Sequence, residues 1–135
     1  MEKRLFEIVT DSSCDLPEEY YKEHGLECIR LGFLMDGTNY EGEDGDRIDA
    51  KAFYEKLRAG AMPTTYQVTA EAAKTHFEKF LSAGRDVLVV AFSSGLSGTE
   101  GSYRVAAKEL KEKYPDRTVL VVDSLCASMG EGLFV

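Results

Sequence analysis

Serine and threonine hydroxyls are concentrated in short segments that could bind an anion. The densest segment is Ser93–Thr99, which follows the apolar run 87–92 and precedes apolar positions at helical spacing. An apolar run of this kind is typical of a strand buried in a parallel sheet, so the serines would lie in the turn to the next helix. Such a turn offers hydroxyls and free backbone N–H groups at a helix N-terminus, which together can bind an anion.

Three other segments are expected at the same place. Asp11–Asp15 follows a strand-like run, Pro63–Gln67 is rich in hydroxyls, and Asp123–Ser124 follows a second buried run. Carboxyl ends of parallel strands meet at one edge, where open α/β sheets bind ligands. None of the segments contains Lys or Arg, which favours a carboxylate over a polyphosphate. The alternative is that these hydroxyls only cap helices and form turns.

Known catalytic and metal-binding motifs fit poorly. Gly95–Thr99 resembles a nucleophile elbow, but its last glycine is a threonine and no histidine follows Ser97. A Walker lysine and a G-x-G-x-x-G motif are both missing. The acidic run Glu41–Asp46 lacks EF-hand spacing and is interpreted as a solvated loop. His24 and His76 are interpreted as surface or packing residues, so we expect no metal site.

Composition and charge exclude several classes of function. The 135 residues suffice for one domain with a core, and 44% of them are hydrophobic. A net charge of −8 disfavours nucleic acid and anionic membrane surfaces as partners. The sequence has no apolar run long enough to span a bilayer, no signal-peptide core, and three cysteines that suggest no disulfide framework. We expect a cytoplasmic protein with only transient membrane contact.

The elements that must position these segments alternate between strands and helices. Apolar runs predict strands at 5–10, 26–34, 87–92 and 118–122, with a hairpin return through Tyr40. Helices are predicted to follow Pro17, Asp49, Thr69 and Thr99. The second helix should bury Phe53 and Leu57. This alternation predicts an α/β domain of three layers, α/β/α, with a mostly parallel sheet.

Four motifs, in this order, resemble the DegV family, whose members include the fatty-acid-binding subunits of bacterial fatty acid kinase. The motifs are Thr10-Asp11-Ser12 with Asp15-Leu16-Pro17, Pro63-Thr64-Thr65-Tyr66-Gln67, the segment Ser93–Thr99, and Asp123–Gly132. Each motif is weak alone, but their common order and context make the resemblance specific. It implies that residues 1–135 are the N-terminal α/β domain of a DegV protein. The apolar end Leu133–Val135 supports this, because natural domains rarely stop there, and the family's C-terminal lid domain is expected to be absent.

The resemblance also implies a function. Family members hold one long-chain fatty acid, with its tail in an apolar tunnel and its carboxylate among hydroxyls of the second and third motifs. The matching positions here are Thr65 and Ser94, with Thr64, Ser93 and Ser97 close by. Such a protein is a carrier with no catalytic residue and no cofactor. It presents the carboxylate to a separate kinase subunit, which makes the acyl phosphate used in phospholipid synthesis.

Two residues depart from the family pattern. Tyr66 stands where a serine is usual, and its phenol could crowd the carboxylate or replace one donor. Glu100, with Gly101, replaces an aromatic and a polar residue, and its charge would repel a carboxylate unless it points away. The absent lid domain would supply cationic or histidine contacts.

Two other hypotheses about the function stay open at this point. An enzyme acting on a small phosphorylated or carboxylated metabolite at the same edge would use Tyr66 or Asp11 as its acid or base. Alternatively, the domain without its lid binds lipid weakly or not at all, because an open tunnel leaves the tail wet. Its bare apolar face would then pair with a second copy.

Overall fold

The computed structural model describes residues 5–135. Its main body is a parallel sheet of four strands in the order β2-β1-β6-β7. These strands span Glu27–Ile29, Phe6–Asp11, Asp86–Ala91 and Val119–Asp123. Val89 of β6 lies opposite Val9 of β1 on one side and Val121 of β7 on the other, so these three strands share one register.

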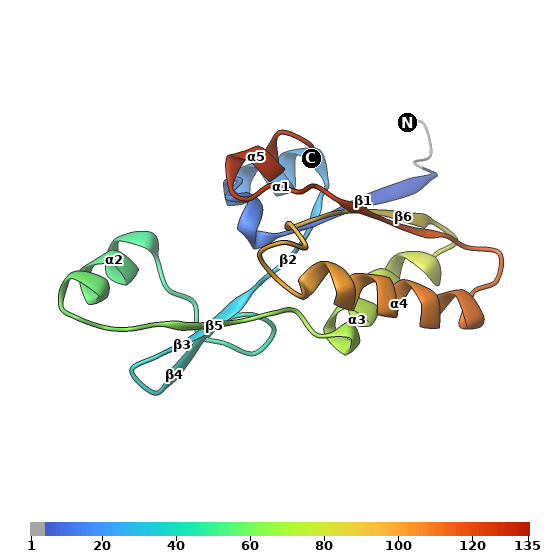
Figure 1. Ribbon diagram of the computed structural model, residues 1–135. Coiled ribbons are helices and arrows are strands. Elements are labelled where there is room, and N and C mark those ends of the chain that lie inside the picture. The colour runs from blue at the N-terminus through green and yellow to red at the C-terminus, as the bar shows by residue number, and fades with distance from the viewer. Residues whose placement is uncertain (1–4) are drawn as a thin grey trace.

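Helices lie on both faces of this sheet (Figure 1). On one face are α3 and α4, which span Ala70–Leu81 and Thr99–Lys113. Near the carboxyl ends of the strands, the other face carries the short helices α1 and α5, at Glu18–His24 and Met129–Gly132, with the 3-10 turn Ser12–Cys14. The predicted three-layer α/β/α architecture with a mostly parallel sheet is confirmed.

The core lies between the sheet and the pair α3 and α4. Alternate strand residues such as Val9 and Val89 point to this face, because successive side chains of a strand point to opposite faces. Phe77 of α3 and Tyr103 of α4 are fully buried here, with ring centroids 5.8 Å apart. The opposite face is only partly covered: Phe6, Leu120 and Val122 are 49%, 57% and 39% exposed.

A second, antiparallel sheet projects from the body and is called the arm below (Figure 1). Its strands, in the order β4-β3-β5, are Thr38–Glu41, Gly32–Met35 and Thr64–Tyr66. The predicted hairpin turn at Asp36 and Gly37 joins β3 to β4, with both residues at positive φ. Helix α2, Ala50–Arg58, also belongs to the arm and begins after its predicted cap Asp49, which accepts a hydrogen bond from the Ala52 N–H at 3.0 Å.

Three predictions about the arm are wrong. The strand expected at 26–34 is two strands in different sheets, because the chain leaves the parallel sheet at Arg30 and Leu31. Residues 64–66, expected in a loop, form β5 and pair with β3, which suits Thr and Tyr as good strand formers. Phe53 and Leu57 are only half-buried, because α2 packs on a small sheet; the Phe53 ring lies 5.2 Å from that of Phe33.

Candidate functional site

Three of the four predicted segments meet at the carboxyl edge of the parallel sheet. Asp11, at the end of β1, accepts a hydrogen bond from the Phe92 N–H at 3.1 Å. The Ser94 N–H, after β6, donates to Asp123 Oδ1 at the end of β7 at 3.2 Å. These contacts join the segments that follow β1, β6 and β7 into one polar edge.

The second motif reaches this edge through its last residue. Gln67 Nε2 donates to Ser102 Oγ at 3.4 Å, and the Val68 N–H donates to Thr99 Oγ1 at 3.2 Å. A Cβ at Gly98 would lie 2.0 Å from Gln67 Oε1, so the absence of a side chain at Gly98 lets the segments approach closely. The end of β5 therefore lies beside the start of α4.

Two of the predicted ligand residues, Ser93 and Ser97, are engaged in the turn itself. Ser93 is buried, and its hydroxyl accepts a hydrogen bond from the Gly95 N–H at 3.2 Å. Ser97 Oγ accepts from the Thr99 N–H at 3.2 Å and donates to Thr99 Oγ1 at 3.0 Å. For these two side chains, the geometry is that of turn formers and caps.

The other three predicted residues, Ser94, Thr64 and Thr65, are exposed to solvent. The Ser94 hydroxyl bonds the Asp123 carboxylate, and this bond lowers the pKa of Asp123. Any anion that takes the Ser94 hydroxyl must compete with this carboxylate. Thr65 lies on β5, in register with Phe33 of β3.

Tyr66 points to the other face of β5, because neighbouring strand residues alternate. Its hydroxyl donates to Asn39 Oδ1 at 2.7 Å. The same ring packs on Gly32, where an added Cβ would lie 2.0 Å from the Tyr66 hydroxyl. The phenol therefore does not lie beside the Thr65 side chain.

Glu100 does not present a free charge to the edge. It is 7% exposed, and its carboxylate pairs with the Arg104 guanidinium one helical turn later in α4. The pairing offsets the negative charge that would otherwise oppose a bound carboxylate.

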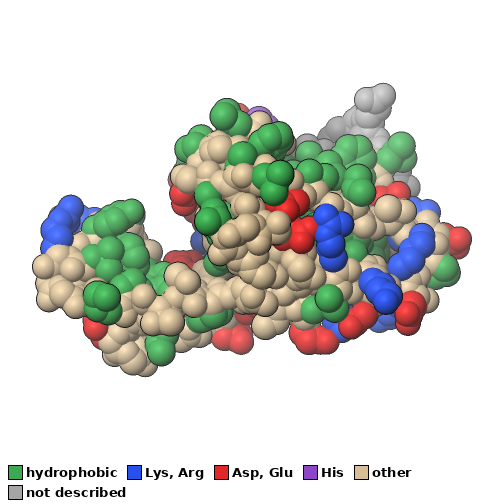
Figure 2. Space-filling view, in the orientation of Figure 1, with side chains coloured by type: hydrophobic (Ala, Val, Ile, Leu, Met, Phe, Trp, Pro, Cys, Tyr) green, Lys and Arg blue, Asp and Glu red, His purple; other side chains and the backbone are tan. Residues whose placement is uncertain are grey.

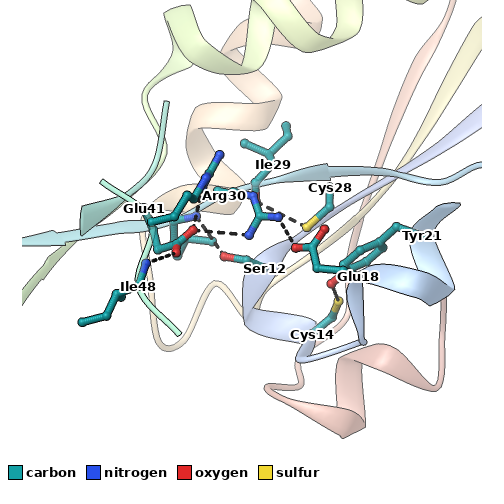
Figure 3. Close-up of polar contacts among 11 residues, drawn as sticks. Ser12, Cys14, Glu18, Tyr21, Cys28, Ile29, Arg30, Glu41 and Ile48 are labelled. Atoms are coloured by element: carbon teal, nitrogen blue, oxygen red, sulfur yellow. Dashed lines mark hydrogen bonds and ion pairs between the residues drawn. The ribbon is translucent and has the colours of Figure 1, made fainter. Parts of the chain in front are cut away.

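A cavity of about 340 Å³ lies between the arm and α3, on the Tyr66 side. Its lining includes Arg30, Asn39, Tyr66, Gln67 and Val68, but not Thr65 or Ser94. Arg30 pairs there with Glu18 of α1 and Glu41 of β4, as Figure 3 shows, so the guanidinium ties the arm to the body. The space-filling view shows a separate hollow between the α2 end of the arm and the body (Figure 2).

His76 makes a second tie between arm and body. Its Nδ1 lies 2.7 Å from Glu27 Oε1 of β2, and its Nε2 lies 2.9 Å from Glu43 Oε1 of the acidic loop. The bond to Glu27, followed by that to Glu43, raises the pKa of His76 above its usual value, although burial opposes the shift. The prediction of a solvated acidic run missed this contact, because His76 and its partners are far apart in the sequence.

Sequence reasoning also did not single out Glu131, which is fully buried in α5. Its carboxyl faces Ser13 and Thr10, with Ser13 Oγ 2.9 Å from Oε2. The one signal was its place inside the fourth motif.

Within residues 5–135, no three His, Cys, Asp or Glu side chains are grouped so that they could hold a metal ion. The three cysteines are free thiols. In the same part of the chain, every helix is too short or too polar to cross a membrane.

The fold and its edge define a class of α/β protein, in which hydroxyl-bearing turns follow the strands of a parallel sheet. Residues 5–135 match the family model described as "Uncharacterised protein, DegV family". The chain belongs to the DegV family.

Relatives and solved structures agree with this assignment. A DegV domain-containing protein of Clostridium perfringens is 42% identical over 132 residues, which are 98% of this chain and 45% of that protein. A stearic-acid-binding protein of Eubacterium ventriosum superposes with a TM-score of 0.86 at 29% identity, covering 95% of this chain and 44% of its own. A DegV family protein of Thermus thermophilus, described by its fatty acid binding, superposes with a TM-score of 0.80 at 33% identity, covering 95% of this chain and 44% of its own. The chain spans a little under half the length of these proteins.

Proposed function

We propose that this chain is the N-terminal domain of a carrier that binds one long-chain fatty acid and presents its carboxylate to a partner kinase. The observation that carries the proposal is the similarity, over 95% of the chain, to solved DegV proteins described as binding fatty acids. The relatives' greater length supports a second domain that covers the lipid. The chain itself would supply no catalytic residue and would act in the cytoplasm.

Two exposed hydroxyls, one at the edge of the parallel sheet and one on β5 of the arm, support the proposed position of the carboxylate. Ser94 and Thr65 are both accessible, and Thr65 lies on the face of β5 opposite Tyr66. Their segments contain no Lys or Arg, so neutral donors would bind the headgroup and the second domain would contribute the cation. Ser93 and Ser97 would hold the turn in shape. Thr64 would lie at the margin of the carboxylate site.

Energetically, the tail and the headgroup would have separate roles. Each buried CH₂ contributes about 0.8 kcal/mol, so the tail supplies most of the affinity. A hydrogen bond to the charged carboxylate adds roughly 1.5–3 kcal/mol and fixes its orientation.

The partly covered sheet face, with Phe6 and Leu120 exposed, would pair with a second copy when the chain is alone.

Neither acid/base candidate of the alternative enzyme has a suitable geometry. Asp11 is fully buried, with its carboxyl bonded to Phe92 and Tyr103. The Tyr66 hydroxyl is bonded to Asn39. The carrier therefore has the stronger support.

Mass spectrometry of extracted lipid tests the proposal on the natural protein, expressed from its whole coding sequence. We expect about one long-chain fatty acid per molecule. Protein that is repeatedly empty, and that also fails to take up added oleate or palmitate, would contradict the carrier function.

A further inference from the structure

Two buried carboxyl groups, from opposite ends of the chain, meet at one hydroxyl. Asp11 and Glu131 both have exposures of 0%. Ser13 Oγ lies 2.9 Å from Glu131 Oε2 and also bonds Asp11 Oδ1. Thr10 Oγ1 donates to Glu131 Oε1 at 3.2 Å.

The remaining donors favour Asp11. Its Oδ2 accepts from the Phe92 N–H at 3.1 Å and from the Tyr103 hydroxyl at 3.3 Å, and its Oδ1 accepts from the Ser13 N–H at 3.2 Å. Among the described residues, the donors to Glu131 are the hydroxyls of Thr10 and Ser13, and its carboxyl also forms a side-chain hydrogen bond with that of Asp11. Asp11 is therefore the better site for a negative charge.

The groups packed around the pair supply no positive charge. Among the described residues, no Lys, Arg or His forms an ion pair with either carboxyl. The titratable neighbours on the adjoining elements are Tyr103 of α4, Cys28 of β2, Cys14 of the 3-10 turn and Tyr21 of α1. Burial raises the pKa of Tyr103 and Tyr21, and raises that of Cys28 to about 12, so these three groups are neutral at pH 7.

The hydrogen atoms can be counted. An ionised carboxylate only accepts hydrogen bonds, and a serine hydroxyl has one hydrogen to donate. If both carboxyls were ionised, Ser13 could donate to only one, and its oxygen would face the other carboxylate without a hydrogen between them. One proton on Glu131 completes the chain: Glu131 Oε2–H donates to Ser13 Oγ, and Ser13 Oγ–H donates to Asp11 Oδ1.

We propose that Glu131 is a positioning residue that carries this proton, and that the chain from Glu131 through Ser13 to Asp11 holds the Ser93–Ser94 turn in place. The effect on the ligand rests on the proposed function, whereas the location of the proton does not. Burial, followed by the nearby Asp11 charge, raises the pKa of Glu131 to about 8. Burial also raises the pKa of Asp11, against the effect of its hydrogen bonds.

The turn is held from both sides of this pair. On one side, Asp11 bonds the Phe92 N–H, directly before the turn. On the other, the segment leading into α5 bonds it through Cys126 O, which accepts from the Ser93 N–H at 3.1 Å. Ionisation of Glu131 would place two buried negative charges together and push α5 away from β1. The turn would then lose one of these supports and would keep its bonds to Asp123.

Carbon-13 NMR of the side-chain carboxyls tests the proton, with the amide signals of Ser93 and Ser94 followed in the same samples. In the 135-residue chain, we expect Glu131 to titrate near pH 8 and both amide signals to shift over the same range. In Glu131→Gln, the side-chain amide of the glutamine donates to Ser13 in place of the carboxyl and does not titrate. The backbone amide signals of Ser93 and Ser94 should therefore stay fixed between pH 6 and 9. Titration of Glu131 near its usual 4.5 overturns the proposal, as do identical amide shifts in the variant.

Fatty acid binding is measured separately on the natural protein. Oleate affinity should fall at least threefold between pH 7 and 9.5 in the wild type and remain within twofold in Glu131→Gln. An equal fall in both proteins overturns the role of Glu131 at the ligand site. Failure to bind oleate at every pH contradicts the proposed function, while the NMR result still decides where the proton lies.

Discussion

At the residue scale, the Ser94 hydroxyl combines exposure with a fixed position. Its backbone N–H and its hydroxyl both bond Asp123, so the side chain is oriented before any ligand arrives. Because the hydroxyl has one hydrogen to donate, a fatty acid carboxylate would have to replace Asp123 as its acceptor. The cost of displacing Asp123 is small, because that residue is only half-buried and its carboxylate remains in contact with water.

Substitution of Ser94 should therefore affect presentation more than retention. We expect Ser94→Ala to change fatty acid affinity less than about threefold, because the Ser94 hydroxyl gives up its bond to Asp123 when it binds the carboxylate, so its net contribution is small beside that of the tail. Acyl-phosphate formation with the partner kinase should fall about tenfold or more, the equivalent of one hydrogen bond to a charged group. Ser82→Ala, in the exposed loop after α3, is the matched control. If Ser94→Ala supports acyl-phosphate formation at the wild-type rate, Ser94 does not bind the carboxylate.

Glu131 should make the stability of the chain depend on pH. Its pKa is raised from 4.5 to about 8 in the folded state, so the folded state binds more protons than the unfolded state between these values. The free energy of unfolding then falls as the pH rises from about 5 to 8, and levels off above. Relative to Glu131→Gln, we expect the wild type to lose more than about 1 kcal/mol over this range. Urea unfolding at a series of pH values measures this difference. A free energy of unfolding that changes with pH by the same amount in wild type and Glu131→Gln would contradict the prediction.

At the scale of elements, the arm is held to the body by Arg30 and His76. Arg30 pairs with Glu18 and Glu41, and His76 bridges Glu27 and Glu43. The acidic loop is therefore tied down although its sequence resembles a solvated run. The arm's orientation determines where Thr65 lies relative to the turn that carries Ser94.

The His76 contact should weaken at high pH. Because its pKa is raised in the folded state, its contribution is fully present below about 6.5 and is lost as the pH rises through the higher folded value. We expect amide hydrogen exchange in residues 42–46 to be faster, relative to the rest of the arm, in His76→Gln than in wild type at pH 6. His24→Gln, which changes the chain's other histidine, is the control. Equal protection of this loop in wild type and His76→Gln at pH 6 would show that His76 does not hold it.

Two glycines should respond to alanine in opposite directions. A Cβ at Gly45 would lie 2.0 Å from the Glu41 backbone oxygen, so the acidic loop would have to move. At Gly101, within α4, an added Cβ meets nothing within 4 Å. We expect Gly45→Ala to destabilise the fold by about 1–3 kcal/mol, and Gly101→Ala to stabilise it by about 0.5–1 kcal/mol. Thermal unfolding measures both, and a stable Gly45→Ala protein would contradict the tight loop.

Parts of the body and of the arm could be predicted from the sequence because their signals are local. The run 87–92, the cap at Asp49 and the turn at Asp36 and Gly37 each specify structure within a few residues. Strand β5 was missed because its three exposed residues have no apolar pattern; pairing with β3 makes them a strand. For the same reason, the pairing of Glu131 with Thr10, 121 residues away, left no local signal.

At the scale of the whole molecule, the described fold offers a polar edge and a partly bare sheet. Hydrophobic side chains remain exposed above β1 and β7 (Figure 2). The relatives are more than twice as long as this chain, so further chain is available in them to cover such surfaces. A lipid tail needs this cover, because an open groove leaves its CH₂ groups in water. If the proposed second domain provides this cover, residues 1–135 alone should bind lipid more weakly than a protein that also contains that domain.

The most direct test of the account is a crystal structure of the natural protein loaded with oleate. We predict that the oleate carboxylate lies within hydrogen-bond distance, about 2.5–3.2 Å, of the hydroxyls of Ser94 and Thr65. Its tail should run away from the sheet edge under the second domain. A carboxylate bound instead in the Tyr66 cavity, or out of reach of both hydroxyls, would contradict it.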